Sequence, residues 1–156
     1  MRLGRFSLAA QAACLALLLS ACSHFSQPSI ELRTLTLDVA PSANADTPIA
    51  VDLVAIQDPD LLKLLLSLPA KQWFDQREQL RRDYLQAIRV WSLELVPGQF
   101  MEARDLPITG DPAVGLLVYA GYNNPGTHRL RLDQQQAVWL RFESKNMRLL
   151  DNPTRK

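Results

Sequence analysis

The apolar and polar positions along the chain divide it into an apolar start, a polar link and a folded region. After the short basic start at residues 1–5, residues 6–19 are apolar except for Ser7 and Gln11. This is the layout of a signal peptide, and the apolar segment is shorter than the roughly 20 residues that a membrane-spanning helix needs. Residues 23–29 are polar, so we expect a tether between the exported start and a folded domain.

Strand patterns dominate the folded region. Alternating or continuous apolar positions between turn residues predict strands over residues 32–39, 49–56, 89–96, 100–108, 114–122, 128–132, 137–142 and 147–150. The segment 114–122 is almost continuously apolar, which predicts a strand buried on both faces in the middle of a sandwich. The first two strands flank a loop rich in breakers at residues 41–48, and we expect them to be adjacent antiparallel partners.

A helical insertion of about residues 58–88 is expected between the second and third strands. Asp58 followed by Pro59 suits a helix start, and Leu61 to Leu66 continues with good helix formers. A second helix is expected after Pro69, with its charged stretch at residues 77–83 as a solvated face. Short strands with turn-punctuated spacing predict a mainly β domain over residues 31–156, a two-sheet antiparallel sandwich with this insertion after the second strand.

The junction Leu19-Ser20-Ala21-Cys22 resembles the lipobox at which bacteria lipidate a cysteine and cleave just before it. We therefore expect residues 1–21 to be a signal peptide cut between Ala21 and Cys22, and residues 22–30 to be the lipidated cysteine and tether. Each buried methylene of the lipid would contribute about 0.8 kcal/mol to membrane attachment. The alternative is a soluble secreted protein in which Cys22 carries no lipid.

The remaining composition gives no enzyme signature. Cys14 lies in the segment expected to be removed, so the mature chain keeps no second thiol for a disulfide or metal cluster. The 17 basic and 16 acidic residues become 15 and 16 without Arg2 and Arg5, which argues against nucleic acid as the main partner. His24 and His128 have no triad or metal-ligand spacing around them. We predict no catalytic site, no metal and no cofactor besides the covalent lipid on Cys22.

The three tryptophans do not form a run of aromatic residues that would indicate a binding site. Trp73, Trp91 and Trp139 fall on separate predicted elements, where packing into the core is the expected role. Ser23 occupies the position at which enteric-type bacteria commonly use aspartate to keep a lipoprotein in the inner membrane. By that analogy the chain is expected at the periplasmic face of the outer membrane.

The order of these elements resembles the type VI secretion outer-membrane lipoprotein family, TssJ. The resemblance runs from Leu32 to about Leu150, and three segments carry it: residues 44–58, Leu95-Val96-Pro97-Gly98 and the apolar strand from Val114 to Gly121. The chain also departs from the family pattern. Its helical insertion opens with leucines, only Trp73-Phe74 resembles the paired aromatics of a typical member, and the first loop is compact.

This resemblance implies a transthyretin-like sandwich that holds a trans-envelope complex to the outer membrane by binding the periplasmic domain of the inner-membrane component TssM. It implies that the loop between the first two strands makes the contact, through Ser42, Ala43, Asn44, Ala45, Asp46 and Thr47. An ordinary solvated loop is the alternative for this segment. For the whole chain, the alternatives are a periplasmic ligand- or glycan-binding lipoprotein, which should have an apolar pocket, and a lipoprotein subunit of another envelope machine.

Overall fold

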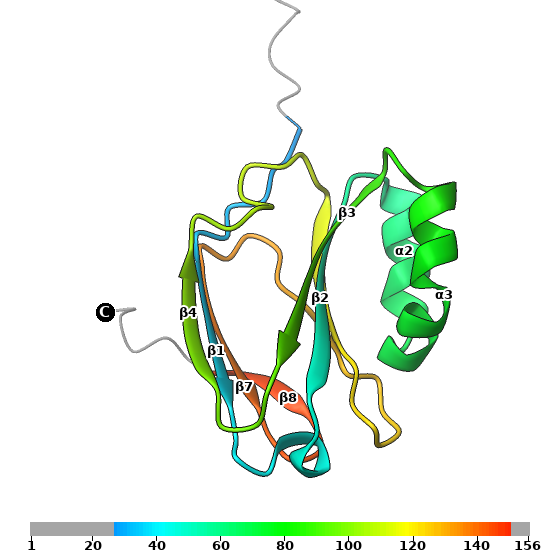
Figure 1. The fold of residues 1–156 in the computed structure, drawn as a ribbon. Coiled ribbons are helices and arrows are strands. Elements are labelled where there is room, and N and C mark those ends of the chain that lie inside the picture. The colour runs from blue at the N-terminus through cyan, green and yellow to red at the C-terminus, as the bar shows by residue number, and fades with distance from the viewer. Residues whose placement is uncertain (1–26, 151–156) are drawn as a thin grey trace, which may run out of the picture.

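A computed structural model describes residues 27–150 as two sheets packed face to face, with helices covering the outer face of one sheet (Figure 1). The first four-stranded sheet has the order β4 (Phe100–Arg104), β1 (Thr34–Val39), β7 (Ala137–Phe142) and β8 (Met147–Leu150). The second has the order β3 (Ile88–Leu95), β2 (Ile49–Ile56), β5 (Gly115–Ala120) and β6 (Arg129–Arg131). A short helical turn, η1 (Ala43–Asp46), follows β1, and helices α2 (Pro59–Ser67) and α3 (Ala70–Asp83) follow β2.

The predicted two-sheet sandwich with helices after the second strand is confirmed, but one predicted pairing is wrong. β1 pairs with β4 and β7, whereas β2 pairs with β3 and β5, so the loop between β1 and β2 crosses from one sheet to the other. Each strand has an apolar face toward the space between the sheets, and placing β1 and β2 in opposite sheets lets these two faces pack against each other. The sandwich is also not purely antiparallel, because β1 and β7 run parallel.

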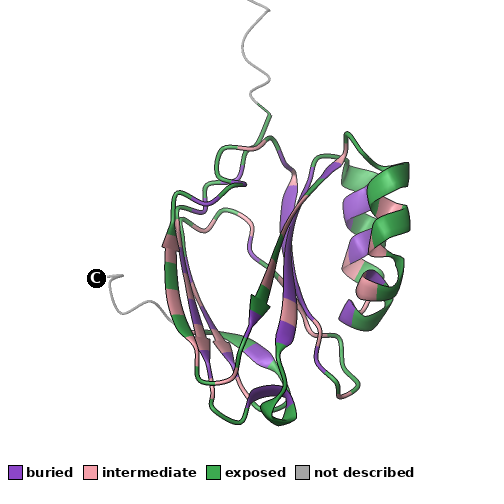
Figure 2. Cartoon of the chain, viewed as in Figure 1, coloured by how far each residue is buried: buried purple, intermediate pink, exposed green. Residues whose placement is uncertain are grey.

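Two apolar clusters explain why β2 and β5 are so uniformly apolar. Leu37, Val51 and Val118 belong to the cluster between the sheets. Val54 and Leu117 belong to a second cluster between the outer face of the second sheet and the helices. Every residue of β5 is buried, as predicted, although helices rather than another sheet cover its second face (Figure 2).

The helix start at Asp58 follows the predicted capping chemistry. The Asp58 Oδ1 atom accepts hydrogen bonds from the backbone N–H groups of Asp60 at 2.9 Å and Leu61 at 2.7 Å, and Pro59 occupies the first turn of α2. These bonds satisfy donors that have no partner within the helix. The helices therefore begin directly where β2 ends.

A buried carboxylate, which the sequence analysis missed, joins α3 to the second sheet. Asp52 lies on the face of β2 that is covered by the helices, with its side chain 1% exposed. Its Oδ2 atom accepts hydrogen bonds from Trp73 Nε1 at 2.8 Å and Arg77 Nη1 at 3.2 Å. The Trp73 ring stacks on Tyr119 at a centroid distance of 5.0 Å. One residue of the stretch 77–83 is thus an anchor for the helix rather than part of a solvated face.

The two ends of the sandwich differ in what they carry. Residues 27–33, where the described chain begins, lie at one end, which we call the N-terminal pole (Figure 1). β1 runs from there to the opposite end, where η1 lies beside the β7–β8 turn and near the β3–β4 turn. We call this opposite end the loop pole.

Candidate partner-binding surface

The predicted contact loop lies at the loop pole, whereas the predicted lipidation and cleavage positions, Cys22 and Ala21, lie outside the described residues. Four of the six predicted contact residues are exposed: Ser42, Ala45, Asp46 and Thr47. Ala43 and Asn44 are buried instead, with 0% and 2% of their surface exposed. The loop is therefore a small exposed tip above two buried residues, and we call residues 45–47 the tip.

The backbone of this loop has an unusual conformation. Asn44, Ala45 and Asp46 follow one another with φ values of 49°, 55° and 61°. A left-handed conformation costs an ordinary L-residue about 1–2 kcal/mol, with asparagine and aspartate tolerating it best. Three such residues in succession persist only where the surrounding structure holds them.

The buried side chain of Asn44 supplies much of that support. Its Nδ2 atom donates to Thr47 Oγ1 at 2.9 Å and to the Pro48 carbonyl at 3.1 Å. Its Oδ1 atom accepts a hydrogen bond from the backbone N–H of Asn123 at 2.7 Å. Thr47 Oγ1 in turn donates to the Asn44 carbonyl at 2.7 Å. One amide thus closes the tip onto itself and ties it to the β5–β6 loop.

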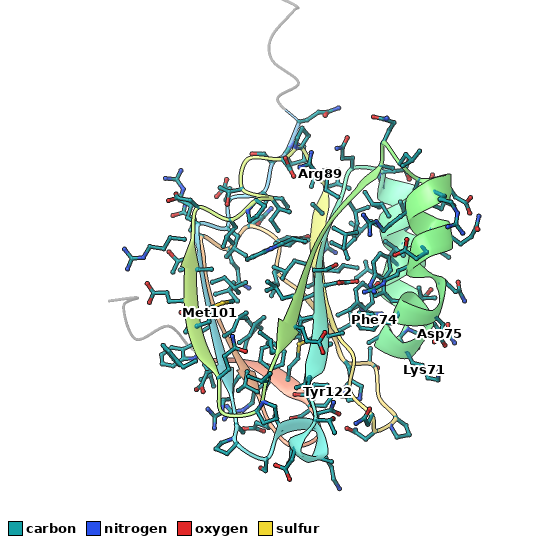
Figure 3. The ribbon with its side chains drawn as sticks, viewed as in Figure 1. Lys71, Phe74, Asp75, Arg89, Met101 and Tyr122 are labelled. Carbon is teal, nitrogen blue, oxygen red and sulfur yellow. The ribbon has the colours of Figure 1, made fainter. Side chains whose placement is uncertain are left out.

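The β7–β8 turn completes the same cluster. The backbone N–H of Asn44 donates to the Ser144 carbonyl at 3.1 Å. The hydroxyl of Tyr122 donates to the carbonyls of Asn146 at 2.6 Å and Glu143 at 3.1 Å, and Figure 3 shows Tyr122 at the loop pole. Burial, reinforced by the nearby Glu143 charge, raises the pKa of Tyr122, so the hydroxyl stays protonated and donates.

The helices brace the β5–β6 loop from its other side. The Thr127 carbonyl accepts a hydrogen bond from the backbone N–H of Ala70 at 2.9 Å. Arg129 Nη1 donates to the Leu68 carbonyl at 2.9 Å, just after α2 ends. The helical insertion therefore holds the loop that receives Asn44, and the support for the tip extends across both sheets.

The exposed part of this cluster is small, polar and nearly neutral. Its residues carry hydroxyl, amide or short apolar side chains with one carboxylate and one amine: Ser42, Ala45, Asp46, Thr47, Asn123, Pro125, Gly126, Thr127, Ser144, Lys145 and Asn146. Within residues 27–150, no group of three or more His, Cys, Asp or Glu side chains is placed to hold a metal ion. The exposed side chains of the cluster can therefore offer hydrogen-bonding groups and small apolar surfaces, held in one arrangement by the buried bonds beneath them.

The residues that support the predicted contact loop were not predicted from the sequence. The segment from Asn123 to Thr127 lies between two predicted strands, and nothing in its local pattern shows that it meets Asn44, 79 positions before Asn123. His128, for which no catalytic or metal-binding role was predicted, is half-buried. Its ring lies 4.7 Å from that of Tyr122, measured between centroids.

A cavity at the N-terminal pole bears on the ligand-binding alternative. It has a volume of about 180 Å³ and lies between residues 28–32, the start of β5 and residues 131–135. Binding sites for small molecules usually measure about 300–1,000 Å³. The carboxylate of Asp133 in its wall already accepts a hydrogen bond from the backbone N–H of Leu116 at 2.7 Å and pairs with Arg131. This cavity gives the ligand-binding alternative little support.

Comparison with known proteins gives matches by fold alone. The sequence matches no protein-family profile and no curated protein. The type VI secretion lipoprotein TssJ1 from Pseudomonas aeruginosa matches at 16% identity with a TM-score of 0.62, over 80% of this chain and 98% of that one. Serratia marcescens Lip, a membrane-bound component of the type VI secretion system, matches at 12% identity with a TM-score of 0.54, over 76% and 96%.

A third match comes from a structure of TssM, which is the predicted partner. A chain in the structure described as the TssM C-terminal domain from EAEC matches at 15% identity with a TM-score of 0.56, over 77% of this chain and 98% of that one. The fold is therefore that of a two-sheet sandwich of the type VI secretion lipoprotein kind. The resemblance to TssJ stated from the sequence is confirmed at the level of the fold.

Within residues 27–150, neither helix has the length and apolar character to cross a bilayer.

Proposed function

We propose that this chain is an outer-membrane lipoprotein that anchors a type VI secretion complex by binding the periplasmic domain of TssM through the loop pole. The observation that carries the proposal is the separation of the two poles: the chain enters at one end of the sandwich and presents the tip at the other (Figure 1). The fold shared with TssJ1, and the similar chain in the TssM structure, support the same partner.

The dimensions of the chain suit an anchor. An extended residue spans at most about 3.6 Å, so the five steps from Cys22 to Gln27 reach at most about 18 Å from the lipid. The six residues of β1 add about 20 Å between the poles. A lipid on Cys22 would thus hold the domain close to the membrane while leaving the tip free to face the periplasm.

Lipidation is tested by intact-mass measurement on the protein extracted from membranes. We expect residues 1–21 to be absent and the mass to exceed that of the remaining chain by the mass of the attached acyl groups. A Cys22→Ser variant removes the thiol that would carry the lipid and should lose the added mass. An unmodified Cys22, or residues 1–21 still attached, would overturn the anchoring part of the proposal.

Partner binding is tested by titrating the mature protein with the purified periplasmic domain of TssM. Asp46→Arg changes an exposed charge on the tip and should weaken binding at least tenfold, because a larger side chain of opposite charge replaces a short contact residue. Asp83→Arg is the matched control, since it makes the same change in an exposed residue at the other end of the molecule, where an arginine suits the helix end. Absence of binding by the unaltered protein, or equal weakening by both variants, would contradict this use of the loop pole.

A further inference from the structure

Asn44 combines a buried position with an exposed neighbourhood. Its side chain belongs to the predicted contact loop, yet only 2% of the residue is exposed, so it has almost no surface to offer a partner. We infer that Asn44 is a positioning residue, and that the docking surface is a composite of the tip, Asn123 and the β7–β8 turn held in one arrangement. This inference rests on the proposed function for its partner but predicts properties of the free protein as well.

The tip depends on residues outside it for its shape. Ala45 and Asp46 have left-handed backbones, with φ values of 55° and 61°, and Ala45 has no side-chain group that favours this conformation. Within the tip, only Thr47 closes the turn, through its bond to the Asn44 carbonyl and through its N–H, which donates to the same carbonyl at 3.3 Å. The side chain of Asn44 adds two more bonds, to Thr47 Oγ1 and to the Pro48 carbonyl.

The side chain of Asn44 also fixes the tip relative to the β5–β6 loop. Asn44 Oδ1 accepts from the Asn123 N–H, and Thr47 Oγ1 accepts from Asn123 Nδ2 at 2.9 Å. Asn123 is exposed, so its side chain lies in the same face as that of Thr47. A surface fixed before binding loses less conformational freedom on association than a mobile loop does. The docking surface therefore extends beyond the β1–β2 loop.

The charge of this surface indicates the kind of partner it fits. Asp46 and Lys145 offset each other. Glu143 pairs with Arg148 at 2.9 Å, and the other exposed residues of the cluster are uncharged. Such a surface suits a folded protein domain that offers hydrogen-bonding groups at fixed positions. It does not suit a partner that binds mainly through a strong net charge. We expect the dissociation constant to change less than about threefold between low and high salt, because screening acts mainly on exposed charges.

The test begins with the mature protein alone. The Asn123 N–H lies in an exposed loop and donates to the Asn44 side chain, so its exchange with solvent measures this contact directly. NMR should show slow exchange at Asn123 in the unaltered protein and fast exchange in Asn44→Ala and Asn44→Gly, while the amides of β5 stay protected. Ile108→Val, a mild core change outside the loop cluster, is the control and should leave Asn123 protected. Fast exchange in the unaltered protein, or slow exchange in both Asn44 variants, would overturn the inference.

The second arm measures affinity for the periplasmic domain of TssM. Both Asn44 variants should bind at least tenfold more weakly, although neither removes an exposed contact, and Ile108→Val should bind normally. Asn44→Gly accepts the left-handed backbone without strain, so it separates the loss of the side chain from the loss of the fold. If the unaltered protein binds and Asn44→Gly binds equally well, the inference is wrong while the proposed function stands. If the unaltered protein does not bind at all, the proposed function fails, and the docking role of Asn44 fails with it.

Discussion

Replacement of Ala45 by glycine should stabilise the protein, although glycine usually destabilises a folded chain. Ala45 has φ 55° and ψ 45°, and its side chain is exposed, so the substitution removes no buried contact. Relief of the left-handed backbone is worth about 1–2 kcal/mol. The greater freedom of glycine in the unfolded chain costs about 0.5–1 kcal/mol. The difference between these two ranges predicts a gain of about 0–1.5 kcal/mol, centred at about 0.75 kcal/mol, in the free energy of unfolding.

Urea titration of the mature protein, followed by circular dichroism, measures this gain. Ala137→Gly is the matched control, because Ala137 is also exposed but begins strand β7 without a left-handed backbone. The free energy of unfolding of Ala137→Gly should fall by about 0.5–1 kcal/mol, so the two substitutions should change stability in opposite directions. A loss of stability in Ala45→Gly equal to that in the control would refute the argument that the tip is strained. The glycine should also weaken partner binding, since a freer tip is less prepared for it.

Three further predictions concern other parts of the fold. Trp73→Phe should lower the free energy of unfolding by about 2–4 kcal/mol, because it removes a donor to the buried Asp52 carboxylate and shrinks a fully buried ring; a loss below about 1 kcal/mol in urea would contradict that bond. Burial raises the pKa of both Tyr119 and Tyr122 above the ordinary value of 10.0, so the folded state keeps the protonated hydroxyls. Their contribution to the free energy of unfolding should be fully present below pH 10. Above pH 10 the free energy of unfolding should fall by up to about 1.4 kcal/mol per pH unit for each tyrosine. A free energy of unfolding that stays constant up to pH 11 would count against this. Tyr122→Phe should remove the part of this pH dependence that comes from Tyr122. It should also lower the free energy of unfolding at neutral pH, because it removes the hydroxyl that joins the β5–β6 and β7–β8 loops.

Local patterns in the sequence predicted the elements well because their causes are local. Asp58 before Pro59 favours a helix start through bonds within three residues. The continuous apolar run around β5 reports burial on both faces, whichever elements provide it. The same patterns placed most strands within two residues of their observed bounds, since alternation reports which side chains face the core, but β4 ends at Arg104 rather than at residue 108.

The arrangement of the elements depends on contacts that no local pattern contains. The parallel pairing of Leu37 with Leu140 joins residues about 100 positions apart, and nothing near either residue selects the other. Asp52 is an ordinary polar position in an alternating strand as far as the sequence shows, and only the packing of α3 brings the Trp73 donor to its carboxylate. Likewise, Asn44 appeared to be one of six equivalent loop residues. Only the fold brings the Asn123 N–H to the side chain of Asn44.

The course of β1 has a mechanical consequence for an anchored protein. The described backbone starts at the N-terminal pole and follows β1 to the loop pole. It reaches the tip a few residues after β1 ends at Val39 (Figure 1). A pull between a membrane lipid and a partner on the tip would therefore travel mainly along the covalent bonds of one strand. β4 and β7 flank that strand on either side without lying in the line of tension. Such a molecule can carry load through its first strand while the rest of the sandwich remains folded around it.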